Sequence, residues 1–572
     1  MQRFGFSRLP IYGAVLACCS IISGLVPGGL QTATAQDATP AAGTTDPVLV
    51  VTVASFNKVM QDVNYMSGVL GQPQVGGMFS MLAGTFTQGL DTSRPLAVLV
   101  PMVDGTPEPI GVIPTDNVEA MLKRLEPQTG PVDKLDDGTL VVQAGPALAY
   151  IRQVGSWAVV ARNRELIDLV PADPMPLMEG LGDAYDIGIR LNIQEIPLPL
   201  REMLVEQIGQ GFEQAIARQP GGDDQLIDLS KSQLEQLNKV IRESDKVLFG
   251  ININPAKRVV NIDTQFTAAA GTELAEMYAG TQSIPSLFAS VLGGNAAAYY
   301  HAAASLSPAV IEASQTSIDA LMGNLSQMLD NQEELGDDVK ADIEELVGGL
   351  VDLVSDSLQE GKYDFGMISN ADDNVLRLAG GTFVHSGDDV AKWVQNLDSK
   401  LRQLPDAPEF RFDESTYNGV TMHSVVIDIP AKADEARKLF GEQATIHLGT
   451  APNAVYFAFG KGSVDMMKGL IDTADTDRGD VSGRPLGQMR VKLLPWLRLA
   501  QSIKANDSLA AVIDTVALSN DTDYVLLTGE SIPNGQATYI EIGEGIIQAI
   551  GVAISEAQRV QMQQLQQGGG QF

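Results

Sequence analysis

Four segments of the sequence share one order of structural signals, and this repetition constrains the fold more than any other feature. Each segment has an apolar run, a turn rich in Pro, Asn, Asp or Gly, a second apolar run and a stretch with helical spacing. This order is typical of a hairpin followed by a helix. The four segments are residues 94–125, 245–278, 363–397 and 523–550. We therefore predict a repeated architecture of antiparallel hairpins, each followed by a helix.

A second shared part precedes each hairpin, and it has the pattern of a short strand that leads into a helix. The four copies are residues 47–60, 185–208, 297–313 and 489–503. Helix-start signals support this interpretation, because Ser307 precedes Pro308, and Asp116 and Ser386 each stand three residues before an acidic residue. The predicted unit is therefore strand, helices, hairpin and helix, and it occurs four times.

Strand-rich insertions between the units divide the chain into two halves. Residues 136–170 and 417–472 both begin at an Asp-Gly or Asn-Gly turn and run through strands into a helix. In the resulting self-alignment, Trp157 stands opposite Tyr456. The sequence therefore predicts an α+β fold of two homologous halves, residues 47–285 and 290–556. Each half is expected to have a mixed or antiparallel sheet with helices packed on one face.

The stretch AFGKGSVDMMKGLID, residues 458–472, has the strand, glycine-rich turn and helix of a phosphate-binding loop. That motif requires four residues between its first Gly and Gly-Lys-Ser/Thr, so that enough backbone amides surround the phosphates. Here Lys461 lies between two glycines, and the equivalent turn of the first half, at Arg162, contains no glycine. We interpret the stretch as a strand-to-helix turn whose glycines adopt unusual backbone angles. We predict that no nucleotide or other cofactor binds there.

Candidate catalytic residues are few. The four histidines are His301, His385, His423 and His447, and no pair has the i, i+4 spacing of a helical metal site. Motifs of zinc hydrolases and serine hydrolases are absent from the sequence. Structural histidines are therefore favoured over catalytic ones, although one histidine could still act as a general base. The catalytic residues stay unassigned.

An acidic stretch at residues 472–483 resembles half of a calcium-binding loop. Asp475, Asp477 and Asp480 lie within six residues, but Leu486 occupies the position where such a loop has its bidentate Glu. A solvated acidic linker is the favoured interpretation, and we predict no metal site.

The first 35 residues have the pattern of a secretory signal peptide. A basic start precedes an apolar run, and Ala33 and Ala35 fit the small-residue cleavage rule, which would make Gln36 the new N-terminus. A lipoprotein signal with Cys18 as the lipidated residue is the alternative. No later segment has the roughly 18 uninterrupted apolar residues of a membrane span. At the two ends of the predicted halves, we expect residues 36–46 to be a linker and residues 557–572, rich in Gln and Gly, to be a disordered tail.

Charge and cysteine content exclude several functions. The chain has 71 acidic and 38 basic residues, which gives a formal net charge of -33. Binding of nucleic acid or anionic lipid relies on Lys and Arg, so cations and basic proteins are the electrostatically favoured partners. Both cysteines, Cys18 and Cys19, lie in the predicted signal peptide. The exported chain would therefore have no thiol for disulfides, metal binding or nucleophilic attack.

In general outline the chain resembles large exported bacterial proteins of unknown function with repeated strand-helix-hairpin-helix units. The residues that carry the resemblance are the signal segment and stretches in which a turn and a strand precede a helix, such as DGTLVV, YNGVTMHSVV and residues 454–472. The resemblance covers most of residues 47–553. It implies a repeated fold but no catalytic residues.

These observations predict an exported, non-enzymatic protein of the periplasm, cell surface or extracellular space. We expect it to bind a macromolecule or an apolar ligand through a concave sheet or the cleft between the halves. A hydrolase without a recognisable motif is the alternative. A cleft that holds His385 or His423 with carboxylates would favour the hydrolase. An apolar groove without titratable groups would favour the binding protein.

Overall fold

The structure is a computed structural model, and it describes residues 46–568 with short gaps. The gaps are residues 145–146, 218–237, 331, 333–335, 373–374, 403–406, 475, 478, 480 and 482. The predictions for residues 1–45, including the signal peptide and Cys18, lie outside the described residues. The described chain contains both helices and antiparallel strands, so the α+β prediction is confirmed.

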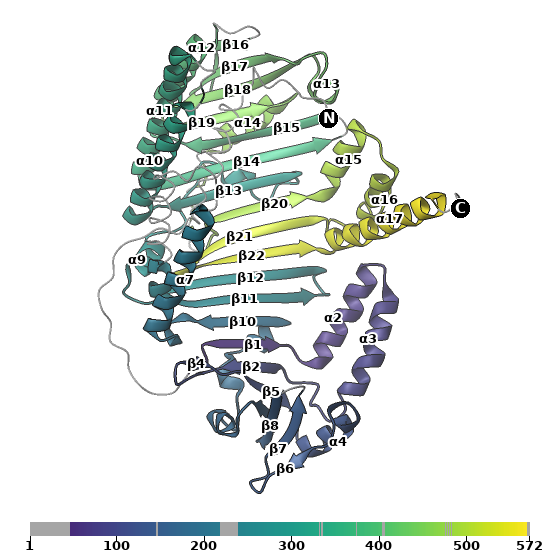
Figure 1. Cartoon of the computed structure of the whole chain (residues 1–572). Helices are drawn as coiled ribbons and strands as arrows, with labels where there is room; N and C mark the ends of the chain where they lie inside the picture. The colour runs from purple at the N-terminus through teal and green to yellow at the C-terminus, as the bar shows by residue number, and fades with distance from the viewer. Residues whose placement is uncertain are drawn as a thin grey trace.

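The core of the structure is one continuous sheet of 20 strands among the described residues (Figure 1). From one edge to the centre, the order is β6 (Asp133–Lys134), β7 (Leu140–Ala144), β8 (Ala147–Val154), β9 (Trp157–Ala161), β5 (Ile110–Pro114), β2 (Leu96–Val100), β1 (Leu49–Val53), β10 (Ile187–Asn192), β11 (Ser244–Asn254) and β12 (Val259–Ala268). A small separate ribbon consists of β3 (Met102–Val103) and β4 (Thr106–Pro107).

The other side of the sheet has the same strand order. From its edge to the centre, the strands are β16 (Glu409–Tyr417), β17 (Val420–Asp428), β18 (Gln443–Ala451), β19 (Ala454–Phe459), β15 (Val375–Phe383), β14 (Lys362–Asp372), β13 (Ala298–Ser305), β20 (Gly487–Lys492), β21 (Tyr524–Ile532) and β22 (Gly535–Gly543). The four predicted hairpins form as β2–β5, β11–β12, β14–β15 and β21–β22. Every ladder between described strands is antiparallel, so the sheet has none of the mixed pairing that the sequence left open.

Helices lie beyond both ends of the strands. Figure 1 shows α7 (Leu198–Ala217), α9 (Glu273–Ala279), α10 (Pro308–Asp330), α11 (Asp337–Gln359) and α12 (Gly387–Leu401) along the left margin. Along the right margin are α2 (Phe56–Val69), α3 (Pro73–Phe86), α15 (Leu493–Ile503), α16 (Asp507–Val516) and α17 (Glu544–Gly568). The sides alternate because β1 pairs antiparallel with β10, and β13 with β20, so the helices that follow these strands emerge at opposite ends.

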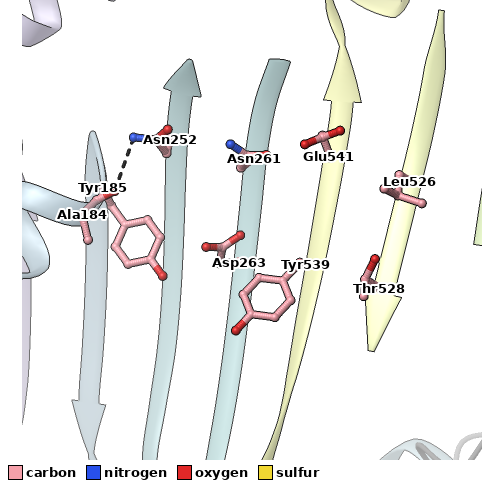
Figure 2. A pocket seen from close by; sticks show the side chains of 9 residues that line it. All are labelled: Ala184, Tyr185, Asn252, Asn261, Asp263, Leu526, Thr528, Tyr539 and Glu541. Atoms are coloured by element: carbon pink, nitrogen blue, oxygen red, sulfur yellow. Dashed lines mark hydrogen bonds between the residues drawn. The ribbon is translucent and has the colours of Figure 1, made fainter. Parts of the chain in front are cut away.

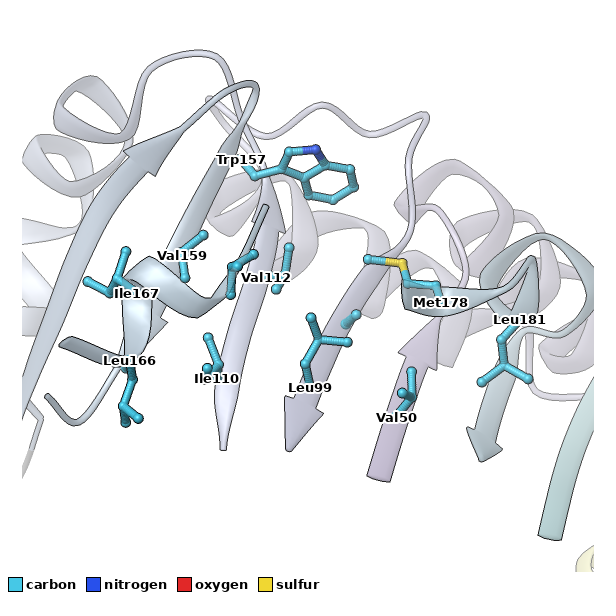
Figure 3. Packing of buried hydrophobic residues seen from close by; sticks show 13 residues of the cluster. Val50, Leu99, Ile110, Val112, Trp157, Val159, Leu166, Ile167, Met178 and Leu181 are labelled. Carbon is cyan, nitrogen blue, oxygen red and sulfur yellow. The ribbon is translucent and has the colours of Figure 1, made fainter. Parts of the chain in front are cut away.

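The two faces of the sheet are packed differently. We call the face that carries Val50 and Thr52 the pocket face, and the face that carries Val53 the trough face, because side chains alternate along a strand. Val50 and Thr52 are 0% exposed, whereas Val53 is 37% exposed. We call the strands of each half that lie away from the centre its wing. On the pocket face, the wing of the first half is covered by η1 (Arg164–Leu169), α5 (Met175–Met178) and α6 (Leu181–Ala184). Figure 3 shows this layer against Leu99 and Trp157.

The second wing of the pocket face is covered by η3 (Ala289–Val291) and α14 (Ser463–Thr473). Their side chains pack with Tyr456 and Ala458 of β19. The remaining short turn, η2 (Ile193–Glu195), follows β10. Other helices pack on the trough face, so helices contact both faces of the sheet. Helix α14 and the short helices α5 and α6 differ from the expectation of helices on one face.

On the trough face, helices pack against the ends and the wings of the sheet. Tyr278 of α9 contacts Phe266 of β12, with ring centroids 5.8 Å apart. Trp496 of α15 packs with Ala371 of β14 at the opposite strand end. The outer strands of the two halves are covered by α4 (Val118–Thr129), which packs on β7, β8 and β9, and by α13 (Asp434–Phe440), which packs on β15 and β18. The helices therefore stand on the trough face as walls at its margins.

Local helix starts follow the predicted chemistry in two of three cases. Ser386 Oγ accepts from the Asp389 amide at 3.2 Å, and Ser307 Oγ accepts from the Val310 amide at 3.3 Å. For α4, however, the cap is Asn117 and not Asp116, because Asn117 Oδ1 accepts from the Ala120 amide at 2.9 Å.

The glycine-rich turn before α14 has unusual backbone angles. Gly460 and Gly462 have φ of 95° and 80°, which confirms that they supply left-handed backbone before α14.

The segment from residue 557, predicted to be disordered, is helical as far as Gly568 within α17. Its Gln, Met and Leu residues are good helix formers, and α17 packs beside α16.

The two halves of the sheet meet at the ladder between β12 and β22, which we call the seam. A side-chain cluster reinforces it: Glu544 at the start of α17 accepts from Arg258 Nη2 at 2.7 Å and from the Tyr65 hydroxyl at 2.6 Å. Arg258 lies in the β11–β12 turn and Tyr65 in α2, so this carboxylate connects three elements. Glu544, which makes both contacts, is only 7% exposed.

We predict that Glu544→Ala destabilises the protein by about 2 kcal/mol, because it leaves Arg258 and the Tyr65 hydroxyl without their acceptor. Urea unfolding monitored by circular dichroism measures this. Glu556→Ala is the matched control on the same helix, since its partner Arg559 lies on the surface three residues away. A loss of stability in the control as large as in Glu544→Ala would contradict a specific role of the seam cluster.

Candidate binding surfaces

The trough face of the eight central strands is apolar and partly exposed. The registers place one row of side chains across β2, β1, β10, β11, β12, β22, β21 and β20. This row, which we call the trough floor, consists of Leu96, Val53, Ile187, Ile251, Ile262, Ile540, Leu527 and Met489. Seven strand-to-strand steps of about 4.8 Å make it roughly 34 Å long. Every residue of the row is apolar.

The trough floor is partly exposed to solvent. Val53, Ile187 and Met489 are 37%, 43% and 36% exposed, and the other five side chains of the row are half-buried. No helix among the described residues is drawn across the middle of these strands in Figure 1. The neighbouring trough-face side chains on the same eight strands are also uncharged, although 109 of the protein's residues are charged by the sum of its acidic and basic residues. The chain therefore has a long uncharged apolar surface between helical walls.

The pocket face has a small cavity at the seam, which we call the seam pocket. Its volume is about 310 Å³, and it is lined by Ala184, Tyr185, Asn252, Asn261, Asp263, Leu526, Thr528, Tyr539 and Glu541. Figure 2 shows Asp263 between the rings of Tyr185 and Tyr539. Tyr185 follows α6, Asp263 lies on β12, and Tyr539 lies opposite Asp263 on β22. Both halves of the sheet therefore contribute to this pocket.

A glycine positions one wall of the seam pocket. The Tyr185 ring lies directly over Gly250 of β11, where a Cβ atom would be 2.3 Å from two of the ring carbons. The adjacent Asn252 Nδ2 donates to the Ala184 carbonyl at 3.3 Å, which holds the end of α6 against the strand (Figure 2). The ring can occupy this position only because residue 250 has no side chain.

The carboxylates of the seam pocket have different surroundings. Burial raises the pKa of Asp263 above its ordinary value, and a hydrogen bond from Tyr185 partly offsets this. Burial also raises the pKa values of Tyr185 and Tyr539, so both rings are neutral phenols near pH 7. Glu541 Oε1 accepts from the Tyr524 hydroxyl at 2.5 Å. The pocket is thus acidic and aromatic.

Comparisons with protein-family models, with curated proteins and with solved structures found no match for this chain. The suspected resemblance to repeated exported proteins therefore stays a prediction.

The candidate histidines lie at different places in the structure. His385 Nδ1 lies 2.7 Å from Glu360, and both side chains are about half exposed on the surface. His423 is buried between β16 and β18, where its Nδ1 accepts from the Asp413 amide and its Nε2 contacts Thr450 Oγ1 at 3.0 Å. Neither histidine lines the seam pocket or the trough floor. Burial lowers the pKa of His447, which lies on β18.

His301 belongs to a buried polar cluster that the sequence did not indicate. Its Nε2 lies 2.9 Å from Ser286 Oγ, and this hydroxyl donates to Asp364 Oδ1 at 2.6 Å. Serine therefore lies between histidine and aspartate, whereas a catalytic triad has histidine between the other two. Ser286 is 3% exposed and also accepts from the Phe288 amide at 2.9 Å. The cluster fastens the segment before η3 to β13 and β14.

The described part of the chain has neither a cluster of metal ligands nor a membrane-spanning helix. No group of three or more His, Cys, Asp or Glu side chains there is placed to hold a metal ion. Asp477 of the predicted acidic linker pairs with Arg484, at 2.8 Å for one oxygen, and accepts from the Ser286 amide. Asp475 and Asp480 lie outside the described residues. No described helix is both long enough and apolar enough to cross a membrane.

Both surfaces depend on residues that the sequence interpretation did not single out. Their signal was strand alternation, which is visible in NIDTQ (261–265) and TYIEI (538–542). There, Ile262 and Ile540 alternate with polar Asp263 and Glu541. Alternation predicts one apolar and one polar face. It does not say which strands become neighbours, so it could not have placed Asp263 opposite Tyr539.

The buried cluster generates a pH prediction. Burial raises the pKa of Asp364 from 3.8 to about 6. The native carboxyl thus holds its proton where the unfolded one has lost it, so its stabilising contribution is complete below pH 3.8 and is lost as the pH rises to 6. We expect the stability of the wild type relative to Asp364→Asn to fall by up to about 3 kcal/mol over this interval.

Urea unfolding of both proteins at several pH values measures this difference. Burial also lowers the pKa of His301, to about 4, and its contribution has the opposite sign, growing as the pH rises from 4 towards 6.5. His301 is present in both proteins, so the comparison removes the part of its contribution that does not depend on Asp364. Parallel curves for the wild type and Asp364→Asn would contradict the prediction.

Proposed function

We propose that this protein is an exported, non-enzymatic binding protein whose trough holds an uncharged apolar ligand, such as the hydrocarbon chain of a lipid. The observation that carries the proposal is the trough floor, a row of eight apolar side chains of which three are exposed and five are half-buried. Exposed apolar surface on this scale is unfavourable in water and is typical of a binding site.

The shape and charge of the trough favour a chain-like ligand. The floor runs across eight strands, so an extended chain lying along it would contact both halves of the sheet. Walls rise at the strand ends, where α9 packs on Phe266 and α15 packs with Ala371. These walls favour a narrow ligand over a second flat sheet. A charged ligand group would lose water on this surface without gaining a partner.

The alternative of a hydrolase has less support. An apolar groove without titratable groups was the feature expected of the binding protein, and the uncharged apolar row of the trough floor supports that proposal. The expected sign of a hydrolase was a cleft holding His385 or His423 with carboxylates. His385 instead pairs with Glu360 on the surface, and Asp413, the carboxylate nearest His423, is itself 73% exposed.

Binding of N-phenyl-1-naphthylamine, an uncharged dye that fluoresces in apolar surroundings, tests the proposal. We expect saturable binding by the wild type and at least about a tenfold weaker affinity for Ile262→Asp and Ile187→Asp, because each places an unpaired charge on the trough floor. Gln265→Asp is the matched control, since Gln265 lies on β12 but on the opposite face. Its affinity should stay within about twofold of the wild type.

Two outcomes would contradict the proposal. One is the absence of saturable dye binding by a wild-type protein that is folded by circular dichroism. The other is a wild-type dimer in analytical ultracentrifugation that Ile262→Asp converts to monomer, because a second copy would then occupy the trough. Thermal unfolding of each variant confirms that it is folded at the assay temperature.

Export itself rests on the sequence. The basic start, the apolar run and the small residues at Ala33 and Ala35 support cleavage before Gln36. We predict that the protein recovered from outside the cytoplasm begins at Gln36, as measured by intact mass and N-terminal sequencing. A lipid-modified Cys18 at the N-terminus would instead identify a lipoprotein.

We propose further that the two halves, residues 47–285 and 290–556, are homologous and arose by duplication. Their identical strand order supports this, as does the position of Trp157 on β9 and of Tyr456 on β19. Both side chains are buried, at 2% and 3% exposure, on the pocket face of corresponding strands. The duplication would place the seam between two copies of one hairpin.

A further inference from the structure

The seam pocket lies on the face opposite the trough, and its chemistry selects a different ligand. Of its nine lining residues, two are carboxylates and none is Lys, Arg or His. In the described part of the chain, no ion pair joins Asp263 or Glu541 to a basic side chain. Arg490 lies beside this group, with its guanidinium 4.5 Å from the centroid of the Tyr524 ring and outside the pocket lining. The two carboxylates of the pocket would attract a bound cation.

The walls of the pocket add a second preference. Tyr185 and Tyr539 present their rings on either side of Asp263 (Figure 2). The negative face of an aromatic ring attracts a cation, most strongly where water is excluded. Gly250 leaves the space against β11 that the Tyr185 ring occupies. Aromatic faces with a carboxylate between them suit an organic cation better than a metal ion, which needs several oxygen ligands.

We propose that the seam pocket binds an organic ammonium group, held by the carboxylates of Asp263 and Glu541 and by the ring faces of Tyr185 and Tyr539. The cavity, about 310 Å³, accommodates such a group and a short part of the chain attached to it. The protein's net charge of -33 attracts cations to this surface over a longer range. This site is independent of the ligand proposed for the trough.

Isothermal titration calorimetry at low ionic strength tests the proposal, with tetramethylammonium as the probe. Its uncharged counterpart, 3,3-dimethylbutan-1-ol, has a similar shape and should show no saturable binding. Asp263→Asn keeps the shape of the side chain but removes its charge, and we expect roughly tenfold weaker binding of tetramethylammonium. Tyr539→Leu should weaken binding roughly threefold to thirtyfold.

Two further variants separate a built pocket from a generally acidic surface. Glu435→Gln removes an exposed carboxylate from α13, outside the pocket lining, and its affinity should stay within about twofold of the wild type. Gly250→Ala should weaken binding, because the new Cβ displaces the Tyr185 ring. Thermal unfolding confirms that each variant is folded.

The source of the ammonium group is decided by two additional probes. Binding of N-acetyl-lysine amide without binding of phosphocholine would assign a lysine of a partner protein. The reverse would assign a lipid headgroup, and binding of neither beside tetramethylammonium would assign a free quaternary amine. No saturable binding of tetramethylammonium by the folded wild type would overturn the proposal. Equal affinities of the wild type and Asp263→Asn, or equal binding of the uncharged alcohol, would also overturn it.

Discussion

The ladder between β12 and β22 is the interaction on which the rest of the structure depends. It joins two ten-strand arrangements into a single antiparallel sheet, so the chain has one continuous framework. Without this pairing, both strands would be edges with unsatisfied backbone groups, which favour aggregation. Glu544 adds a side-chain connection between the halves at the end of the same strand. Both candidate binding surfaces include strands from the two sides of this ladder.

The two faces of the sheet are specialised for different chemistry by strand alternation. Ile262 and Ile540 pair on the trough face, and their neighbours Asp263 and Tyr539 pair on the pocket face. Buried layers cover the wings of the pocket face, and helices stand at the margins of the trough face, but neither covering extends over the centre. The central strands are consequently available to ligands on both sides, with an apolar surface on one and an acidic, aromatic pocket on the other.

Local sequence signals gave reliable information about single elements. The four hairpins were predictable because alternating apolar residues and Asn, Asp or Gly turns act within about 20 residues, and the Ser307 and Ser386 caps follow from contacts three residues apart. These signals did not decide between adjacent candidate cap residues or the extent of the last helix. Asn117 and not Asp116 caps α4, and residues 557–568 continue α17, a helix that packs beside α16. Such packing depends on residues distant in sequence.

The sequence by itself determined the α+β class, the four hairpins and the acidic charge, because these depend on composition and on neighbours along the chain. Only the tertiary structure decided that Leu96, Ile262 and Met489 share one row, and that Tyr185 meets Asp263 and Tyr539 at one pocket. The reason is that strand order and register are set by pairing between segments up to several hundred residues apart. Alternation along one strand assigns a side chain to a face, but only its paired neighbours make that face a surface.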